Sequence, residues 1–134
     1  MQYLKPQRMV SPPRLVLKLN FDGAARGNPG AAGFGATCRN LEGEILHLLF
    51  GSIGEDTNNS TKLEGMLQGV KIVIREGWMP TMVEGDSLIL IQMAKQLSYK
   101  RSTEKVSSSW CLSNRLEFLR GLILSQPAMS FHHV

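Results

Sequence analysis

The chain of 134 residues is 43% hydrophobic and 19% charged, which is the composition of one globular domain and argues against a disordered protein. Its net charge of +4 favours a polyanionic partner such as nucleic acid, although a basic protein that binds none would look the same. No apolar run approaches the roughly 18 residues of a membrane span, and no secretory signal opens the chain. We therefore expect an intracellular protein of the cytoplasm or nucleus, with no membrane partner.

The first half of the chain predicts strands. Residues 1–13 contain three prolines and predict a flexible tail or linker, so we place the domain at 14–134. Apolar residues alternate along 14–21, which is typical of a strand, and a glycine-rich loop follows. Two further strands are predicted at 33–39 and 44–50, joined by a hairpin turn. We expect these three strands to form an antiparallel meander.

The second half alternates helices with short strands. Polar residues at 57–60 offer a helix N-cap, and apolar residues at helical spacing then run to Gly77, a typical helix end. The remaining elements expected are a strand at 81–84, a helix at 87–97, a polar loop at 98–109, a helix at 110–125 and a strand that begins at 128. The order βββαβααβ indicates an α/β domain. Cys38 and Cys111 are expected to be buried, reduced thiols rather than a disulfide or metal ligands.

Two aspartates stand at the ends of predicted strands. Asp22 follows the first strand beside a glycine loop, and Asp86 follows the strand at 81–84. Carboxylates at strand ends can converge on one sheet edge, where they bind hard cations such as Mg²⁺. A pair of such ions can hold a phosphodiester for attack by water. Each aspartate alone is also an ordinary turn residue, so their positions leave both interpretations open.

Several short motifs occur together in a fixed order. They are Asn20-Phe21-Asp22-Gly23-Ala24, Gly27-Asn28-Pro29-Gly30, Gly33-Phe34-Gly35, Thr57-Asn58-Asn59, Glu84-Gly85-Asp86-Ser87 and the segment from Trp110 to Val134. As a set they resemble the ribonuclease H family, most closely its plant group related to retroelement domains, over residues 14–134. The resemblance implies a ribonuclease H-like α/β fold, in which helices flank a five-stranded mixed sheet and the first three strands form a meander.

The resemblance also implies a chemistry. Members of the family cleave the RNA strand of an RNA/DNA hybrid with two Mg²⁺ ions held by four acidic residues, and Asp22 and Asp86 match the first and third of these. The family positions that touch the hybrid match Gly23, Asn28, Asn58 and Asn59. Glycine permits close backbone approach, and an amide both donates to and accepts from a 2′-hydroxyl. Without the family, the glycine loop is a tight turn and the asparagines are helix caps.

The second acidic position departs from the family. An alignment without gaps up to Gly69-Val70 places Lys62 where the family has its catalytic glutamate. On the helix, Lys62 lies roughly 80° from the centre of the apolar face and Glu64 roughly 120° away on the other flank. We therefore expect Lys62 to bridge Asp22 and Asp86 in place of a metal, so that Mg²⁺, the family's cofactor, is not bound here. Glu64 could substitute only through a two-residue insertion in the turn.

The fourth acidic position and the final helix of the family fall after Val134, so we expect a domain truncated at its C-terminus. His132 and His133 do not replace the missing carboxylate and are expected to be solvated or strand-facing, and His47 is predicted to be a surface or edge histidine. The last helix of the family covers part of the sheet. We expect its absence to expose apolar surface that favours a homodimer.

Three functions are compatible with the sequence. The first is a catalytically impaired module that binds nucleic acid of the RNA/DNA hybrid type, weakly and with salt sensitivity, or a protein partner. The second is an active Mg²⁺-dependent endoribonuclease, which requires Glu64 to reach the site and a fourth ligand from elsewhere. The third is a retroelement-derived structural or interaction domain that acts within a larger chain. The loss of two family carboxylates favours the first.

Overall fold

The computed structural model describes residues 2–4, 17–78, 81–99, 110–125 and 129–134. Its elements in chain order are β1 (Gln2–Leu4), β2 (Leu17–Ala25), β3 (Gly30–Arg39), β4 (Ile45–Asp56), α1 (Asn58–Glu76), β5 (Thr81–Gly85), α2 (Leu88–Tyr99), α3 (Trp110–Ser125) and β6 (Met129–His133). From β2 onward they follow the order βββαβααβ, so the predicted α/β fold is confirmed. Most of the polar loop predicted at 98–109 lies outside the described residues.

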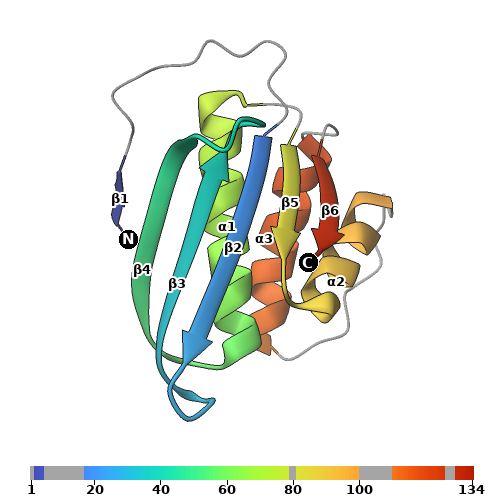
Figure 1. Cartoon of the computed structure of the whole chain (residues 1–134). Helices are drawn as coiled ribbons and strands as arrows, with labels where there is room; N and C mark the ends of the chain where they lie inside the picture. Colours follow the sequence, from blue (N-terminus) through green and yellow to red (C-terminus); the bar gives the residue numbers. More distant parts are fainter. Residues whose placement is uncertain (1, 5–16, 79–80, 100–109, 126–128) are drawn as a thin grey trace.

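The strands form one mixed sheet in the order β1-β4-β3-β2-β5-β6 (Figure 1). Strands β2, β3 and β4 make the expected antiparallel meander, whereas β5 runs parallel to both β2 and β6. Helix α1 packs against β2 and β3, α3 packs against α1, and α2 lies against β5 and β6. In the described part of the chain no helix covers the opposite side of the sheet, which we call the open face (Figure 1).

Alternation along β2 divides its side chains between the two faces of the sheet. Leu17, Leu19 and Phe21 are buried on the side of α1, and the residues between them point to the open face. Helix α1 supplies a matching stripe of buried side chains, which are Leu63, Met66, Leu67, Val70 and Val73. Each such side chain stabilises the fold by about 1.5–3 kcal/mol. The contact is close, because a Cβ added at Gly69 would lie 2.6 Å from Leu19 Cδ1.

Helix α1 begins and ends at signals in its own sequence. Thr57 is the N-cap, and its side chain accepts a hydrogen bond of 3.2 Å from the backbone N–H of Ser60. Gly77 ends the helix in the left-handed conformation, with a φ of 71°. Asn58 and Asn59 are therefore the first residues of the helix and not its caps, so their side chains are left for other contacts.

The other two helices match their predicted ranges within two residues. In α3 the apolar spacing buries Leu116, Leu119 and Ile123. None of the described helices is both long and apolar enough to cross a membrane. Cys38 is a free, buried cysteine of the core, as predicted, and burial raises the pKa of its thiol to about 12. The side chain of Cys111 lies outside the described residues.

The N-terminal segment differs from the predicted tail at one place. Residues Gln2–Leu4 form β1, which pairs antiparallel with the outer edge of β4 and places Tyr3 opposite Leu49. A strand of three residues is too short to show alternation, so no sequence pattern separates it from a tail. The remainder of the predicted tail, residues 5–13, lies outside the described residues.

The prediction that His47 lies at the surface or at an edge is wrong. Its side chain is 1% exposed, and its ring packs edge-on against Trp78 with 5.1 Å between ring centroids. Its Nε2 lies 3.7 Å from Glu76 Oε1. A register shift after Cys38 in the pairing of β3 with β4 leaves two successive residues, Leu46 and His47, buried. Simple alternation cannot anticipate such a bulge.

Candidate functional site

Asp22 and Asp86 lie side by side where two parallel strands end. The register of β2 with β5 pairs Asn20 with Glu84. The next position on the same face of each strand, two residues later, is Asp22 on one side and Asp86 on the other. Both side chains are exposed, and both contribute to the lining of a groove of about 450 Å³ on the open face.

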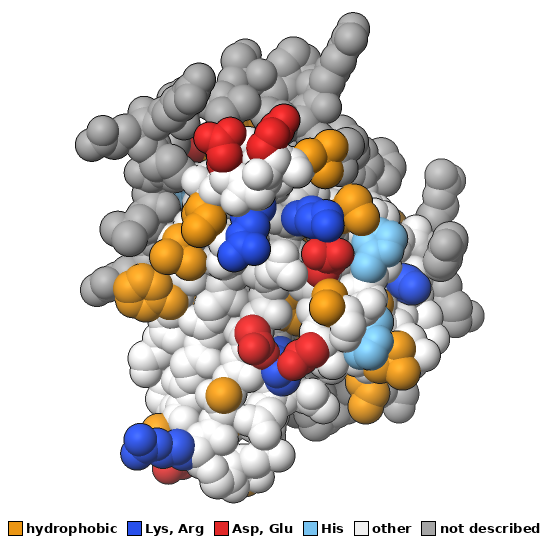
Figure 2. Space-filling view, in the orientation of Figure 1, with side chains coloured by type: hydrophobic (Ala, Val, Ile, Leu, Met, Phe, Trp, Pro, Cys, Tyr) orange, Lys and Arg blue, Asp and Glu red, His pale blue; other side chains and the backbone are white. Residues whose placement is uncertain are grey.

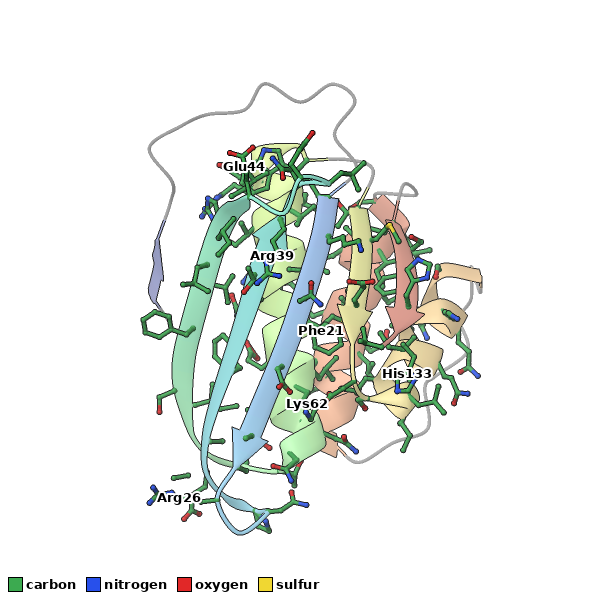
Figure 3. All side chains as sticks on the ribbon, in the orientation of Figure 1. Phe21, Arg26, Arg39, Glu44, Lys62 and His133 are labelled. Atoms are coloured by element: carbon green, nitrogen blue, oxygen red, sulfur yellow. The ribbon has the colours of Figure 1, made fainter. Side chains whose placement is uncertain are left out.

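Lys62 stands between the two carboxylates. It lies in the second turn of α1, and its Nζ donates hydrogen bonds to Asp22 Oδ1 and, at 3.0 Å, to Asp86 Oδ1. Figure 3 shows Lys62 on α1 beside β2. Gly23 permits this approach of helix and strand, because a Cβ there would lie 2.8 Å from the carbonyl carbon of Thr61. The structure thus brings together the three charged residues that the sequence singled out.

The three charges stabilise one another. Partial burial acts to lower the pKa of Lys62, but its hydrogen bonds to Asp22 and Asp86 outweigh burial and raise the pKa above that of an ordinary lysine. Partial burial acts to raise the pKa of Asp22, but the hydrogen bonds from Lys62 and from the Gly23 N–H, at 2.8 Å, lower it overall. Lys62 is therefore a cation and Asp22 an anion at neutral pH.

This set of side chains does not fit a pair of Mg²⁺ ions. A two-metal site needs several oxygen ligands whose charge the ions balance. Here the ammonium of Lys62 already occupies oxygens of both carboxylates. Within the described ranges, no group of three or more His, Cys, Asp or Glu side chains is arranged to hold a metal ion. The donors present therefore do not match the two-metal hydrolysis that the family resemblance implies.

Glu64, which could have replaced the missing glutamate, is held elsewhere. Its Oε1 accepts a hydrogen bond of 3.1 Å from Arg115 Nε, and its Oε2 accepts one of 2.7 Å from Gln68 Nε2. Glu64 lies two positions after Lys62 along the helix, which is a rotation of about 200° around the helix axis. The two side chains therefore point to different flanks of α1, and Glu64 does not approach the carboxylates.

Arg115 joins three elements and was not predicted from the sequence as a site residue. Besides Glu64, its guanidinium donates to Asp56 Oδ2 at 2.9 Å and to Ser60 Oγ. Asp56 ends β4 and Ser60 lies in the first turn of α1, so Arg115 fixes the start of the helix that carries Lys62. No motif marks this arginine, because its partners lie between 51 and 59 residues away in the sequence.

Replacement of Arg115 by methionine should lower the free energy of unfolding by about 2 kcal/mol at pH 7, because Asp56 and Glu64 would stay partly buried without their cation. Partial burial acts to raise the pKa of Asp56, but hydrogen bonds from the Thr57 N–H, Ser60 and Arg115 lower it overall. Such a carboxylate stabilises the fold above its unfolded pKa and loses that contribution as the pH falls through its folded pKa. The effect of the substitution should therefore shrink below about pH 4.

Urea unfolding at pH 7 and at pH 3 measures both parts of this prediction. Arg26→Met is the matched control, because Arg26 is exposed in the β2–β3 hairpin (Figure 3) and should change the stability by less than about 0.5 kcal/mol. An effect of Arg115→Met that is equally large at both pH values would contradict the role given to Asp56.

Two asparagines tie the start of α1 to the β2–β3 hairpin. Asn58 Oδ1 accepts a hydrogen bond from the N–H of Ala25, and Asn28 Oδ1 accepts one from the N–H of Asn58, both at 2.7 Å. Each side-chain oxygen is thus used inside the protein. The amide nitrogens of Asn28 and Asn58 make no hydrogen bond within the described part of the chain, so they remain as donors for a ligand.

The remaining positions that the resemblance assigns to nucleic-acid contact lie around the same centre. Asn59 Oδ1 accepts a hydrogen bond of 3.5 Å from Ser87 Oγ, which places it next to the residue that follows Asp86. Gly23 follows Asp22 directly. The start of α1 is therefore tied both to the hairpin, through Asn28 and Asn58, and to the end of β5, through Asn59.

The C-terminal histidines lie near this centre without contacting its carboxylates. His132 Nε2 is 2.9 Å from Ser130 Oγ, and His133 Nε2 is 3.2 Å from the backbone oxygen of Asp86 (Figure 3). His133 is exposed and His132 partly so, both on strand β6. This agrees with the expectation of solvated strand residues that do not replace an acidic ligand.

The sheet order, the flanking helices and the strand-end carboxylates define an RNase H-like domain. The chain belongs to the reverse transcriptase-like family, whose model matches residues 20–134. No curated protein matches the sequence closely enough to indicate a relative.

Solved structures with the same fold include three RNase H domains. RNase H1 of the halophilic archaeon Halobacterium salinarum is 26% identical, with a TM-score of 0.72 over 88% of this chain and 84% of that one. LC11-RNase H1, isolated from compost and solved in complex with an RNA/DNA hybrid, is 25% identical, with a TM-score of 0.76 and the same coverage. The N-terminal RNase H domain of a Mycobacterium tuberculosis protein, at 24% identity, has a TM-score of 0.76 over 88% of this chain and 86% of that one.

Proposed function

We propose that this domain binds an RNA/DNA hybrid or a related nucleic acid and does not cleave it. The observation that carries the proposal is the ammonium of Lys62, which donates hydrogen bonds to both Asp22 and Asp86. It takes the oxygens that a nuclease of this fold would offer to Mg²⁺, and it stands where the family has its second acidic residue. Without the metal pair, the site lacks both an activated water and a clamp for the charge that develops on the phosphate.

The residues around Lys62 support the binding half of the proposal. The amide nitrogens of Asn28 and Asn58 are donors suited to a 2′-hydroxyl or a phosphate oxygen. The missing side chain of Gly23, in contrast, makes room for Thr61 of α1 and not for a ligand. The net charge of +4 is modest, so we expect weak binding that depends strongly on salt. LC11-RNase H1, solved with a hybrid at 25% identity to this chain, supports the same class of ligand.

Titration of a labelled RNA/DNA hybrid tests the binding. The unmodified protein should bind at low salt and release the hybrid as salt rises. Asn58→Asp keeps the oxygen that accepts from Ala25, removes the amide donor and adds a negative charge, so the Kd should rise at least about tenfold. Asn114→Asp makes the same change at an exposed position of α3 and should leave the Kd within about twofold.

Incubation of the same hybrid with Mg²⁺ or Mn²⁺ tests the absence of cleavage. We expect no RNA product above background. RNA cleavage that Asp22→Asn abolishes would refute the proposal and establish a metal-dependent endoribonuclease. A protein that binds no hybrid even at low salt would refute the nucleic-acid half and leave a structural or protein-binding role.

A further inference from the structure

A largely covered ion network joins α3 to the start of α1. The guanidinium of Arg115 donates through Nε to Glu64 Oε1 at 3.1 Å. Through Nη1 it donates to Asp56 Oδ2 at 2.9 Å and to Ser60 Oγ. The side chain of Arg115 is 22% exposed, and those of Asp56 and Glu64 are 16% and 13% exposed. Charges covered to this extent are screened little by salt and hold one geometry, unlike an exposed surface pair.

The same network reaches the N-cap of α1 from both sides. The other carboxylate oxygen of Asp56, Oδ1, accepts a hydrogen bond of 2.8 Å from the N–H of Thr57, which is the cap. Ser60 follows the cap by three residues and donates its own N–H to Thr57 Oγ1 at 3.2 Å. Arg115 thus holds the residue before the cap and a residue after it. A side chain of α3 therefore fixes the backbone of the first turn of α1.

The residue directly after the cap is Asn58, which carries one of the amide donors of the proposed function. Its N–H donates to Asn28 Oδ1, and its Oδ1 accepts from the N–H of Ala25, both at 2.7 Å. Hydrogen bonds of this kind exist only over about 2.7–3.2 Å, so a displacement of the first turn by about 1 Å breaks them. The amide nitrogens of Asn28 and Asn58 would then lose their fixed directions.

We propose that Arg115 is a positioning residue for nucleic-acid binding, which holds the start of α1 so that the amide donors of Asn28 and Asn58 keep one arrangement. This inference rests on the proposed function, because it concerns the same donors. Figure 2 shows the open face, where acidic and basic side chains lie next to one another and where the groove with Asp22 and Asp86 opens. In this orientation α3 lies behind the sheet. Arg115 therefore acts through the first turn of α1 and not by touching the ligand.

The geometry of the network requires an arginine. Two different nitrogens of Arg115 serve Glu64 and Asp56, and the planar guanidinium holds these nitrogens at a fixed separation. A lysine has all its donors on one terminal atom, so it cannot reproduce both contacts in the same place. Arg115→Lys keeps the net charge of the chain. A loss of affinity in this variant would therefore not come from a weaker general attraction to phosphates.

Titration of the labelled hybrid with the whole chain at several salt concentrations, below the unfolding temperature of each variant, tests the inference. Arg115→Lys should raise the Kd about fivefold, and the slope of log Kd against log salt should stay unchanged because no phosphate contact is lost. The matched control is Ile123→Val, which removes a buried methyl group roughly two turns further along α3 and destabilises the fold away from the start of α1. It should leave the Kd within about twofold.

Amide hydrogen exchange tests the positioning without a ligand. The N–H groups of Ala25 and Asn58 donate the two hydrogen bonds that tie the hairpin to α1. They should exchange about tenfold faster in Arg115→Lys, because the first turn opens locally more often. In Ile123→Val the exchange of the same two groups should stay within about twofold of the unmodified protein, because local opening at the hairpin does not involve the far part of α3.

Unchanged affinity in Arg115→Lys would overturn the inference, and so would exchange that is no faster than in the control. A smaller salt slope in Arg115→Lys would also overturn it, because Arg115 would then contact a phosphate directly. Equal losses of affinity in Arg115→Lys and Ile123→Val would reduce its effect to general stability. Faster exchange in a protein that binds no hybrid would reject the proposed function and would confirm that Arg115 positions the two asparagines.

Discussion

The Lys62→Glu variant should become dependent on divalent cations for its stability. The substitution replaces the ammonium between Asp22 and Asp86 by a third carboxylate. When a chelator removes divalent cations, the three carboxylates repel one another, so the melting temperature of the variant should be lower than that of the unmodified protein. Millimolar Mg²⁺ or Mn²⁺ should then raise its free energy of unfolding by about 1–3 kcal/mol through binding to the folded state alone. Thermal unfolding with chelator and with metal measures the effect without reference to activity.

Lys95→Glu makes the same change of charge on the exposed side of α2 and serves as the control. Its melting temperature should respond to metal no more than that of the unmodified protein. A metal response of the unmodified protein as large as that of Lys62→Glu would mean that Lys62 does not exclude the ion. The non-cleaving function would then lose its main support. Hybrid cleavage gained by the Lys62→Glu variant would show that position 62 is the catalytic glutamate position of the family.

Gly65→Ala should lower the free energy of unfolding by about 1–3 kcal/mol, although alanine is the better helix former. A Cβ at this position would lie 2.8 Å from the backbone oxygen of Asp22 and 3.0 Å from that of Gly35. Backbone atoms of central strands cannot rotate away, so α1 would have to move off the sheet. Lys62 lies nearly one turn earlier on the same helix, and its ammonium would move away from Asp22 with it.

Gly121→Ala is the matched control, because it makes the same change in the middle of α3, where nothing lies within 4 Å of the added Cβ. It should raise the free energy of unfolding by about 0.5–1 kcal/mol through helix propensity alone. Urea unfolding of the two variants should therefore give changes of opposite sign. A Gly65→Ala variant as stable as the unmodified protein would contradict the close contact between α1 and the strands.

Local patterns predict most of the fold because their physical causes are local. The alternation of Leu17, Leu19 and Phe21 predicts β2, and a capping residue and a left-handed glycine mark the two ends of α1. The direction of the Lys62 side chain could also be predicted locally, because an uninterrupted helix fixes the angle between this side chain and the apolar face of α1. Its approach to Asp22 followed only when the family resemblance supplied the position of the helix over the sheet.

Contacts between distant segments could not be predicted in this way. Arg115 meets its partners only after α3 has packed against α1, and nothing in the sequence around it indicates that register. His47 is buried because of a bulge, which shifts alternation by one residue without a sequence signal.

An ion that binds by mass action leaves a protein when its free concentration falls. The ammonium of Lys62 is attached to α1 by a short methylene chain, so its effective concentration at Asp22 and Asp86 is set by covalent geometry and not by the solution. The positive charge is therefore delivered when the chain folds and needs no loading step. A centre built in this way keeps the same charge wherever the protein resides, whatever the local supply of free metal.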